Sequence, residues 1–315
     1  MSVSSGMHVV IGASGGVGAA VVRALQLRGL PVRAVNRSGG GDAAEGIDWV
    51  KADAANAEET RAACEGAAVV YHCANAPYTD WPKQFPPITD NIIEAAAAVD
   101  AKLVFADNLY MYGPVVGPMH EDLPSSATSS KGKVRAAMAR DVLLAHRGGK
   151  VRAVIGRASD FYGPGVTNSA MGDRMFGAAL KGASIDLLGD IDAPHTYTFI
   201  DDFARDLITL GERDEALGEV WHTPNAPAIS TRQFVQKVIE ITKTQPKVRV
   251  APKLVVSSMG LFNPMMREIG EILYQFEDSF IVDHSKFEKT FGKDVTPLDA
   301  GIPQTVAWFR ARDNS

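Results

Sequence analysis

Residues 8–18 read HVVIGASGGVG, an apolar run that breaks into three glycines spaced by three residues. The apolar run predicts a buried strand, and the following residues 19–27 favour a helix. In such a strand–turn–helix, Gly12 permits the tight turn, Gly15 lets backbone amides approach a pyrophosphate, and Gly18 lets the helix pack closely on the strand. The pattern therefore predicts a dinucleotide-binding turn; the alternative is a glycine-rich turn that matches by accident.

The phosphates of such a ligand lie at the helix N-terminus, where free N–H groups and the helix dipole favour negative charge. We therefore assign cofactor binding to the residues of this turn, which are Gly12, Ser14, Gly15, Gly16, Val17 and Gly18.

The second predicted strand, residues 31–38, ends where a dinucleotide fold contacts the adenosine ribose. An acidic residue there would accept hydrogen bonds from the 2′-hydroxyl and repel a 2′-phosphate. This chain has Asn36 followed by Arg37, whose guanidinium suits a phosphate in shape and charge. The pair favours NADP(H) over NAD(H). The alternative is that Arg37 is a solvated loop cation.

Composition excludes several other classes of protein. The formal net charge of the 315 residues is −5, which provides no basic surface for nucleic acid. No run of about 18 apolar residues and no secretory leader pattern occurs, so we expect a soluble, cytoplasmic protein without membrane association. The two cysteines, Cys64 and Cys73, are too few for a disulfide framework or a zinc site, and no metal site is predicted.

Strands alternate with helical patterns along the first half of the chain, as in right-handed βαβ units. The sequence therefore predicts an α/β fold with a Rossmann-type, doubly wound parallel sheet and a smaller C-terminal substrate-binding lobe. We place the nucleotide-binding domain mainly at 1–165 and the lobe mainly at 166–315, with part of the chain returning to the first domain. The predicted strands are 47–51, 67–72, 102–106 and 151–155, and the predicted helices are 58–65, 88–99 and 135–145.

The whole chain resembles the extended short-chain dehydrogenase/reductase superfamily, the group of NAD-dependent epimerases and dehydratases. The landmarks occur in the family's order: the glycine motif, Tyr112-Gly113 after the fifth strand, the segment 157–165 (RASDFYGPG), and FIDD at 199–202. The resemblance implies that Asp53 and Ala54 contact the adenine, and that Cys73, Ala74 and Asn75 lie beside the cofactor. Asn91 falls where the family carries a helix asparagine.

The chain departs from the family at the catalytic residues. Asn108 stands where the family has its serine; an amide can polarise a carbonyl but cannot relay a proton. The Tyr-x-x-x-Lys pair is also lost, because no tyrosine occurs between Pro124 and Arg140. Depending on register, the pair maps onto Ser129 and Lys133 or onto Lys131 and Arg135.

The proton-transfer task must then pass to another group or disappear. Tyr110 lies two residues after Asn108 on a segment expected to be extended, so it should face the same side; the alternative is a packed aromatic. Lys131 or Lys133 could serve if burial and a nearby nicotinamide cation lower its pKa; the alternative is that both are solvated. We take Asn108, Tyr110, Lys131 and Lys133 as the catalytic candidates.

The substrate is expected to be a small molecule. His195 replaces the arginine that clamps a diphosphate in the nucleotide-sugar enzymes of the family, and a neutral histidine is a poor clamp. The C-terminal part also carries an apolar set suited to a ring or acyl chain, although ordinary core packing would explain it equally well. The set is Met171, Met175, Phe176, Met259, Phe262, Met265 and Met266. The substrate-binding candidates are Asp160, Met175, His195 and Tyr197.

Three functions follow from this pattern. The first is an NADP(H)-dependent oxidoreductase acting on a small, mainly apolar carbonyl or alcohol with a non-standard proton donor. The second is a sugar-type epimerase or dehydratase that uses the cofactor transiently. The third is an NADP(H)-binding sensor without turnover. The sequence is compatible with a homodimer, and nucleic acid is not expected as a partner.

Overall fold

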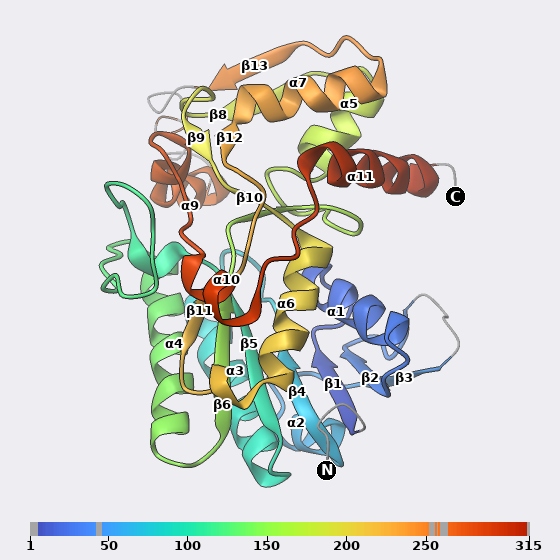
Figure 1. Ribbon diagram of the computed structural model, residues 1–315, viewed down its shortest axis with the longest axis vertical. Helices are drawn as coiled ribbons and strands as arrows, with labels where there is room; N and C mark the ends of the chain where they lie inside the picture. The colour runs from blue at the N-terminus through green and yellow to red at the C-terminus, as the bar shows by residue number, and fades with distance from the viewer. Residues whose placement is uncertain (1–5, 42–45, 252–255, 257, 259–263, 314–315) are drawn as a thin grey trace. The chain divides into compact units, whose positions relative to one another are not determined.

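The computed structural model describes residues 6–41, 46–251, 256, 258 and 264–313 (Figure 1). They form two compact units between which the chain passes several times. The first unit contains the described residues up to Asn108, together with Lys133–Arg157 and Phe203–Thr223. The second contains Leu109–Gly132, Ala158–Asp202 and the described residues from Pro224 onward. Residues 109–132, which we placed with the nucleotide-binding domain, thus belong to the second unit.

The first unit is built on a seven-stranded sheet in the order β11-β6-β5-β4-β1-β2-β3, and every neighbouring pair is parallel. From β1 the chain moves outward to β2 and β3, then returns to β4 on the other side of β1. This reversal creates the switch point at which doubly wound sheets bind ligands. The strands are β1 Met7–Ile11, β2 Val32–Asn36, β3 Ile47–Lys51, β4 Ala67–His72, β5 Lys102–Asp107, β6 Arg152–Arg157 and β11 Val220–His222.

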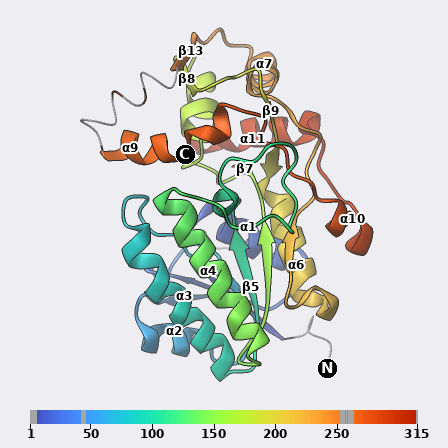
Figure 2. The ribbon, with the colours of Figure 1, turned by 90° about the vertical axis from the view of Figure 1, so that its left-hand side faces the viewer.

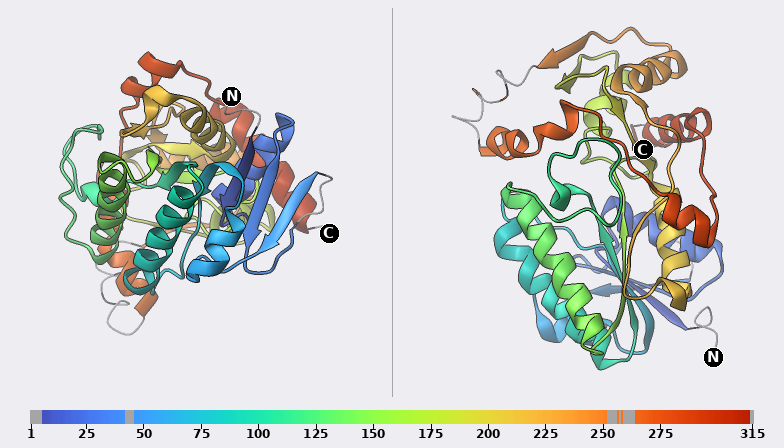
Figure 3. Two further views of the ribbon diagram at one scale, coloured as in Figure 1. Left: turned by 90° about the horizontal axis from the view of Figure 1, so that it is seen from below. Right: turned by 60° about the vertical axis from the view of Figure 1, so that its left-hand side comes forward.

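Helices cover both faces of this sheet, as its apolar strands require. Figures 2 and 3 show α2, α3 and α4 on one face and α1 and α6 on the other. On the second face, α6 packs so closely that a side chain at Gly156 would collide with Leu207. The helices are α1 Gly16–Leu27, α2 Ala57–Ala63, α3 Trp81–Ala98, α4 Ser130–Arg147 and α6 Ile200–Glu212.

Helix α3 begins seven residues before the predicted helix at 88–99. Pro86 and Pro87 predict a break, because proline lacks an N–H donor and clashes with the preceding turn. The helix nevertheless contains both. Its first turns are anchored by the buried side chains of Trp81 and Phe85, whose rings pack edge to face. Burial of these two aromatics outweighs the lost hydrogen bonds.

The second unit has three two-stranded sheets and several helices around its own core. The pairs are β7 Asp160–Tyr162 with β10 Tyr197–Phe199, β9 Pro194–His195 with β12 Ile229–Ser230, and β8 Ile185–Leu188 with β13 Val248–Ala251. The helices are α5 Ala178–Leu180, α7 Thr231–Thr242, α9 Pro264–Glu271, α10 Ser285–Phe291 and α11 Leu298–Asp313. Short helical turns are η2 Tyr110–Tyr112, η3 Asp173–Gly177 and η5 Leu273–Phe276, and η4 Asp214–Ala216 belongs to the first unit.

Three residues of the predicted apolar substrate set are instead part of this core. Met171, Met175 and Phe176 are at most 2% exposed and pack in one cluster with Tyr162, Phe234 and Phe309. The prediction that Met175 binds substrate is therefore wrong, because its side chain is enclosed by other core residues. Met259 and Phe262 lie outside the described residues, as does the side chain of Met265.

Replacing Met175 by alanine should remove about 2–5 kcal/mol of unfolding free energy, because the enclosed site cannot collapse around the lost atoms. Urea unfolding measures the change. Val250→Ala, at a 42% exposed position of the same unit, is the control and should change it by less than about 0.5 kcal/mol. A Met175→Ala protein of unchanged stability would contradict the core assignment.

Candidate functional site

The turn between β1 and α1 has the geometry that the glycine motif predicts. Gly12 has a φ of +90°, and a Cβ there would lie 2.6 Å from the backbone of Ala74. A Cβ on Gly18 would collide with the carbonyl oxygen of Gly12. These two glycines let the helix, the first strand and the segment after β4 approach one another closely.

Gly15 differs from these two, because its backbone is extended (φ −76°, ψ 160°) and suits any residue. A Cβ there would meet only the Gly12 oxygen, at 3.4 Å, so protein does not fill the space beside it. Helix α1 starts at Gly16, has no side-chain cap and carries no acidic residue in its first turn. A helix N-terminus of this kind can accept a pyrophosphate, so the residues present fit a dinucleotide.

The end of β2 is arranged around the side chain of Asn36. Its Oδ1 accepts hydrogen bonds from the backbone N–H groups of Ser38 (3.1 Å) and Gly39 (2.7 Å), and its Nδ2 donates to the Gly40 carbonyl (2.8 Å). Asn36, predicted as a cofactor contact, thus holds the loop after β2. Arg37 starts this loop and its side chain is exposed.

The adenine-side candidates lie on two loops at the carboxyl ends of β3 and β4. Asp53 is exposed and its Oδ1 accepts from the Ala55 N–H, while Asn91 donates to the Ala54 carbonyl at 3.0 Å. After β4, Asn75 is exposed and Cys73 is buried. Burial raises the pKa of the Cys73 thiol to about 12, so it remains a neutral packing group.

A buried ion cluster lies at the carboxyl ends of β5 and β6 in the first unit. The carboxylate of Asp107 lies 3.0 Å from Arg157 Nε and 3.5 Å from Arg135 Nη1. The Arg135 guanidinium also lies over the rings of Trp81 and Phe85, 4.8 and 4.6 Å from their centroids. Burial and Arg135 lower the pKa of nearby His72 to about 3, so this histidine is neutral. Arg135, at the family lysine position in one register, is therefore held within the first unit by Asp107 and two aromatic rings.

Lysines 131 and 133 have different surroundings. Lys133 is exposed, whereas Lys131 is only 1% exposed and its ammonium forms an ion pair with Glu268 of α9. The neighbouring Ser130 N–H donates to Glu271 Oε2 at 2.8 Å. Two carboxylates of α9 thus hold the start of α4. Glu268 and Glu271 were missed by the sequence analysis, since nothing near them in the chain indicates their partners.

Asp160 and His195, two of the predicted substrate-binding residues, lie in contact with each other. Their Oδ2 and Nε2 atoms are 2.9 Å apart, and the imidazole is stacked against the rings of Phe276 and Phe280. The hydroxyl of Tyr197 is hydrogen-bonded to Thr231 Oγ1 at 2.7 Å, and the side chain is buried. Tyr197 therefore packs beside His195 with its hydroxyl already satisfied.

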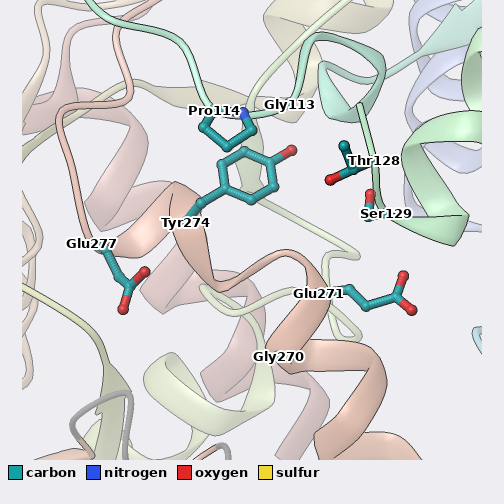
Figure 4. Close-up of a pocket in the computed structure, with 8 residues that line it drawn as sticks. All are labelled: Gly113, Pro114, Thr128, Ser129, Gly270, Glu271, Tyr274 and Glu277. Carbon is teal, nitrogen blue, oxygen red and sulfur yellow. The ribbon is translucent and has the colours of Figure 1, made fainter. Parts of the chain in front are cut away.

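A polar pocket of about 160 Å³ lies within the second unit. Figure 4 shows its lining: Gly113, Pro114, Thr128, Ser129, Gly270, Glu271, Tyr274 and Glu277. The hydroxyl of Tyr274 points toward Thr128 and Ser129. It is buried, and the described residues provide it with no hydrogen-bond partner. Burial, with Tyr110 and Asp160 nearby, raises the pKa of Tyr274, so the phenol stays protonated at neutral pH.

The described residues include no cluster of three or more His, Cys, Asp or Glu side chains suited to a metal ion. Among the helices of the described residues, none is both long enough and apolar enough to span a membrane.

Comparison with known proteins identifies the family. Residues 8–222 match the NAD dependent epimerase/dehydratase family, and the chain belongs to it. No curated protein matches the sequence. The predictions of the family, of the Rossmann-type fold and of an enzyme are thereby confirmed, and a nicotinamide dinucleotide cofactor is supported.

Solved structures are similar over the full chain. A dTDP-glucose 4,6-dehydratase from Bacillus anthracis in complex with NAD has 15% identity and a TM-score of 0.82, with 98% of each chain covered. The UDP-glucose 4-epimerase of Thermus thermophilus, also with NAD, has 20% identity and a TM-score of 0.78, covering 96% of this chain and 99% of the other. A Bacillus cereus UDP-glucuronic acid 4-epimerase has 18% identity and a TM-score of 0.79, covering 97% and 99%. At these identities the likeness shows the fold.

The different surroundings of Gly15 and Gly18 lead to a paired prediction. Gly15→Val should fold with near-normal stability but lose dinucleotide binding by at least about 100-fold, because its side chain fills the space next to the helix N-terminus. Gly18→Val should instead fail to fold stably. Circular dichroism and fluorescence titration with NADPH measure both properties. Normal NADPH binding by Gly15→Val would contradict the assignment.

Proposed function

We propose that the protein is an NADP(H)-dependent oxidoreductase that interconverts a carbonyl and an alcohol on a small, polar, hydroxyl-bearing substrate. The observation that carries the proposal is the polar pocket of the second unit, in a chain whose first unit has a dinucleotide-binding turn. The pocket offers hydroxyl groups from Thr128, Ser129 and Tyr274. These can orient a substrate oxygen by hydrogen bonds.

The first unit would hold the cofactor. The first turn of α1 would receive the pyrophosphate, Arg37 the ribose 2′-phosphate, and Asp53 the adenine amine. A bound nicotinamide supplies or accepts the hydride. The preference for NADP(H) is supported by the exposed Arg37 and by Asn36, whose amide orders the loop without adding a negative charge.

The substrate class is inferred from the size and charge of the pocket. Its volume of about 160 Å³ suits a small compound. Glu271 and Glu277 line it, so a diphosphate would be repelled while hydroxyl donors would be accepted. A polar substrate replaces the mainly apolar one that the methionines indicated, because the described methionines of that set belong to the core or lie outside the pocket.

An epimerase or dehydratase acting on a polar substrate is the second candidate. The polar pocket is compatible with it, and the similar solved structures have such activities. These reactions return the cofactor to its starting state, whereas the proposed reduction consumes one NADPH for each carbonyl. The third candidate, a sensor, would bind NADPH without turnover.

Arg37 should set the cofactor preference. We expect NADPH to bind at least about tenfold more tightly than NADH, or about 1.4 kcal/mol. Arg37→Ala should remove this preference and leave NADH affinity unchanged. Fluorescence titration measures both affinities, and Arg147→Ala, at an exposed arginine on α4, is the control. Retention of the preference in Arg37→Ala would exclude a role in binding the 2′-phosphate.

Matched carbonyl pairs test the reaction itself. Dihydroxyacetone should be reduced with stoichiometric NADPH loss, measured by absorbance, at least about tenfold faster than 3-pentanone at equal concentration. Glyceraldehyde should likewise exceed butanal. The reason is that only the hydroxylated member of each pair can use the polar pocket lining. NADPH binding without consumption on all four compounds would overturn the oxidoreductase proposal in favour of the sensor.

A further inference from the structure

The segment that carries the family's proton-donating tyrosine has none in this chain. That tyrosine maps onto Ser129 or Lys131, depending on register, and residues 124–140 contain no tyrosine. The structure nevertheless brings a tyrosine to this segment from a distant part of the chain. Tyr274, in η5, lines the same pocket as Thr128 and Ser129 (Figure 4).

We propose that Tyr274 replaces the missing tyrosine as the catalytic proton donor of this enzyme, an inference that rests on the oxidoreductase function proposed above. Its hydroxyl is buried and points toward Thr128 and Ser129. A buried phenol without a protein partner among the described residues is costly unless a ligand satisfies it. The Tyr162 hydroxyl is also buried without such a partner, but Tyr162 is enclosed in the core, whereas Tyr274 lines a pocket that a ligand can enter. A substrate oxygen in the pocket would provide that partner.

Other tyrosines of the second unit serve different roles. The hydroxyl of Tyr197 is hydrogen-bonded to Thr231. Tyr162 packs in the hydrophobic core against Phe199 and Phe234. Tyr110 lies close enough to influence the titration of Tyr274, but Tyr274 is the phenol that lines the pocket. Tyr110 therefore flanks the proposed donor.

Helix α9 explains how a residue so far along the chain is held at this segment. Glu268 forms an ion pair with the buried Lys131, and Glu271 accepts a hydrogen bond from the Ser130 N–H. Tyr274 follows Glu271 by three residues. Both contacts involve a charged group, and such contacts are stronger than neutral hydrogen bonds. Lys131 is thus a positioning residue, because its ammonium is committed to the helix that precedes Tyr274.

Proton transfer from Tyr274 accompanies reduction of the carbonyl. The O–H bond of Tyr274 breaks and its proton forms an O–H bond with the carbonyl oxygen, while the hydride reduces the carbonyl carbon and NADPH becomes NADP⁺. The phenolate left behind regains a proton from water. Burial raises the pKa of the Tyr274 phenol, so the hydroxyl carries its proton at neutral pH, and that proton is present when the carbonyl is reduced.

Tyr274→Phe, which removes only the hydroxyl, tests the proposal. With dihydroxyacetone and NADPH, kcat should fall by about 100-fold or more, while NADPH affinity changes by less than about twofold. Calorimetry with dihydroxyacetone and NADP⁺, in which no reaction occurs, should show weaker carbonyl binding by Tyr274→Phe. Tyr162→Phe is the matched control, because it removes a buried hydroxyl from the core of the same unit, and its kcat should stay within about twofold.

Each outcome distinguishes the two proposals. If the natural protein consumes NADPH and Tyr274→Phe does so at a normal rate, the assignment of Tyr274 is overturned and the oxidoreductase function stands. A 100-fold loss in Tyr110→Phe with a normal Tyr274→Phe would transfer the role to Tyr110. If the natural protein reduces none of the four carbonyls, the proposed function fails and this inference fails with it.

Discussion

The close approach of three backbone segments at the switch point is the constraint on which the nucleotide-binding half depends. Gly12 follows β1, Ala74 follows β4, and Gly18 lies in the first turn of α1. Only the absence of a Cβ on both glycines allows the three to meet. Once they meet, α1 points its uncapped N-terminus beyond the carboxyl edge of the sheet, where a pyrophosphate can bind.

In one of the two registers, the positions of the family's Tyr-x-x-x-Lys pair are occupied here by two cations that are held by other side chains. Arg135 is held by Asp107 and two aromatic rings in the first unit, and Lys131 is held by Glu268 in the second. A buried cation is costly without such partners, so both side chains are committed to them. The chain thus lacks the Tyr-x-x-x-Lys pair, and Lys131 and Arg135 of α4 form ion pairs with Glu268 and Asp107, respectively.

The success of sequence reasoning varied with the distance between the residues involved. The glycine turn was predictable because all of its residues lie within eleven positions of one strand–turn–helix. Met175 was misassigned because the sequence alone does not distinguish an apolar side chain that packs in a core from one that lines a pocket. Glu268 and Tyr274 were missed because their contacts join distant segments; Lys131 and Glu268 are 137 positions apart. No local pattern encodes such a pairing.

The sequence by itself determined the class of fold, the alternation of strands and helices in a parallel sheet, and the glycine turn between the first strand and the first helix, because hydrophobic periodicity and glycine spacing act through local geometry. Only the tertiary structure decided that Asn36 orders its loop, that the described apolar residues Met171, Met175 and Phe176 form a core, and that a tyrosine and two glutamates gather beside residues 128–131. These outcomes depend on which distant side chains share a buried space, and packing and desolvation decide that only when the whole chain is folded.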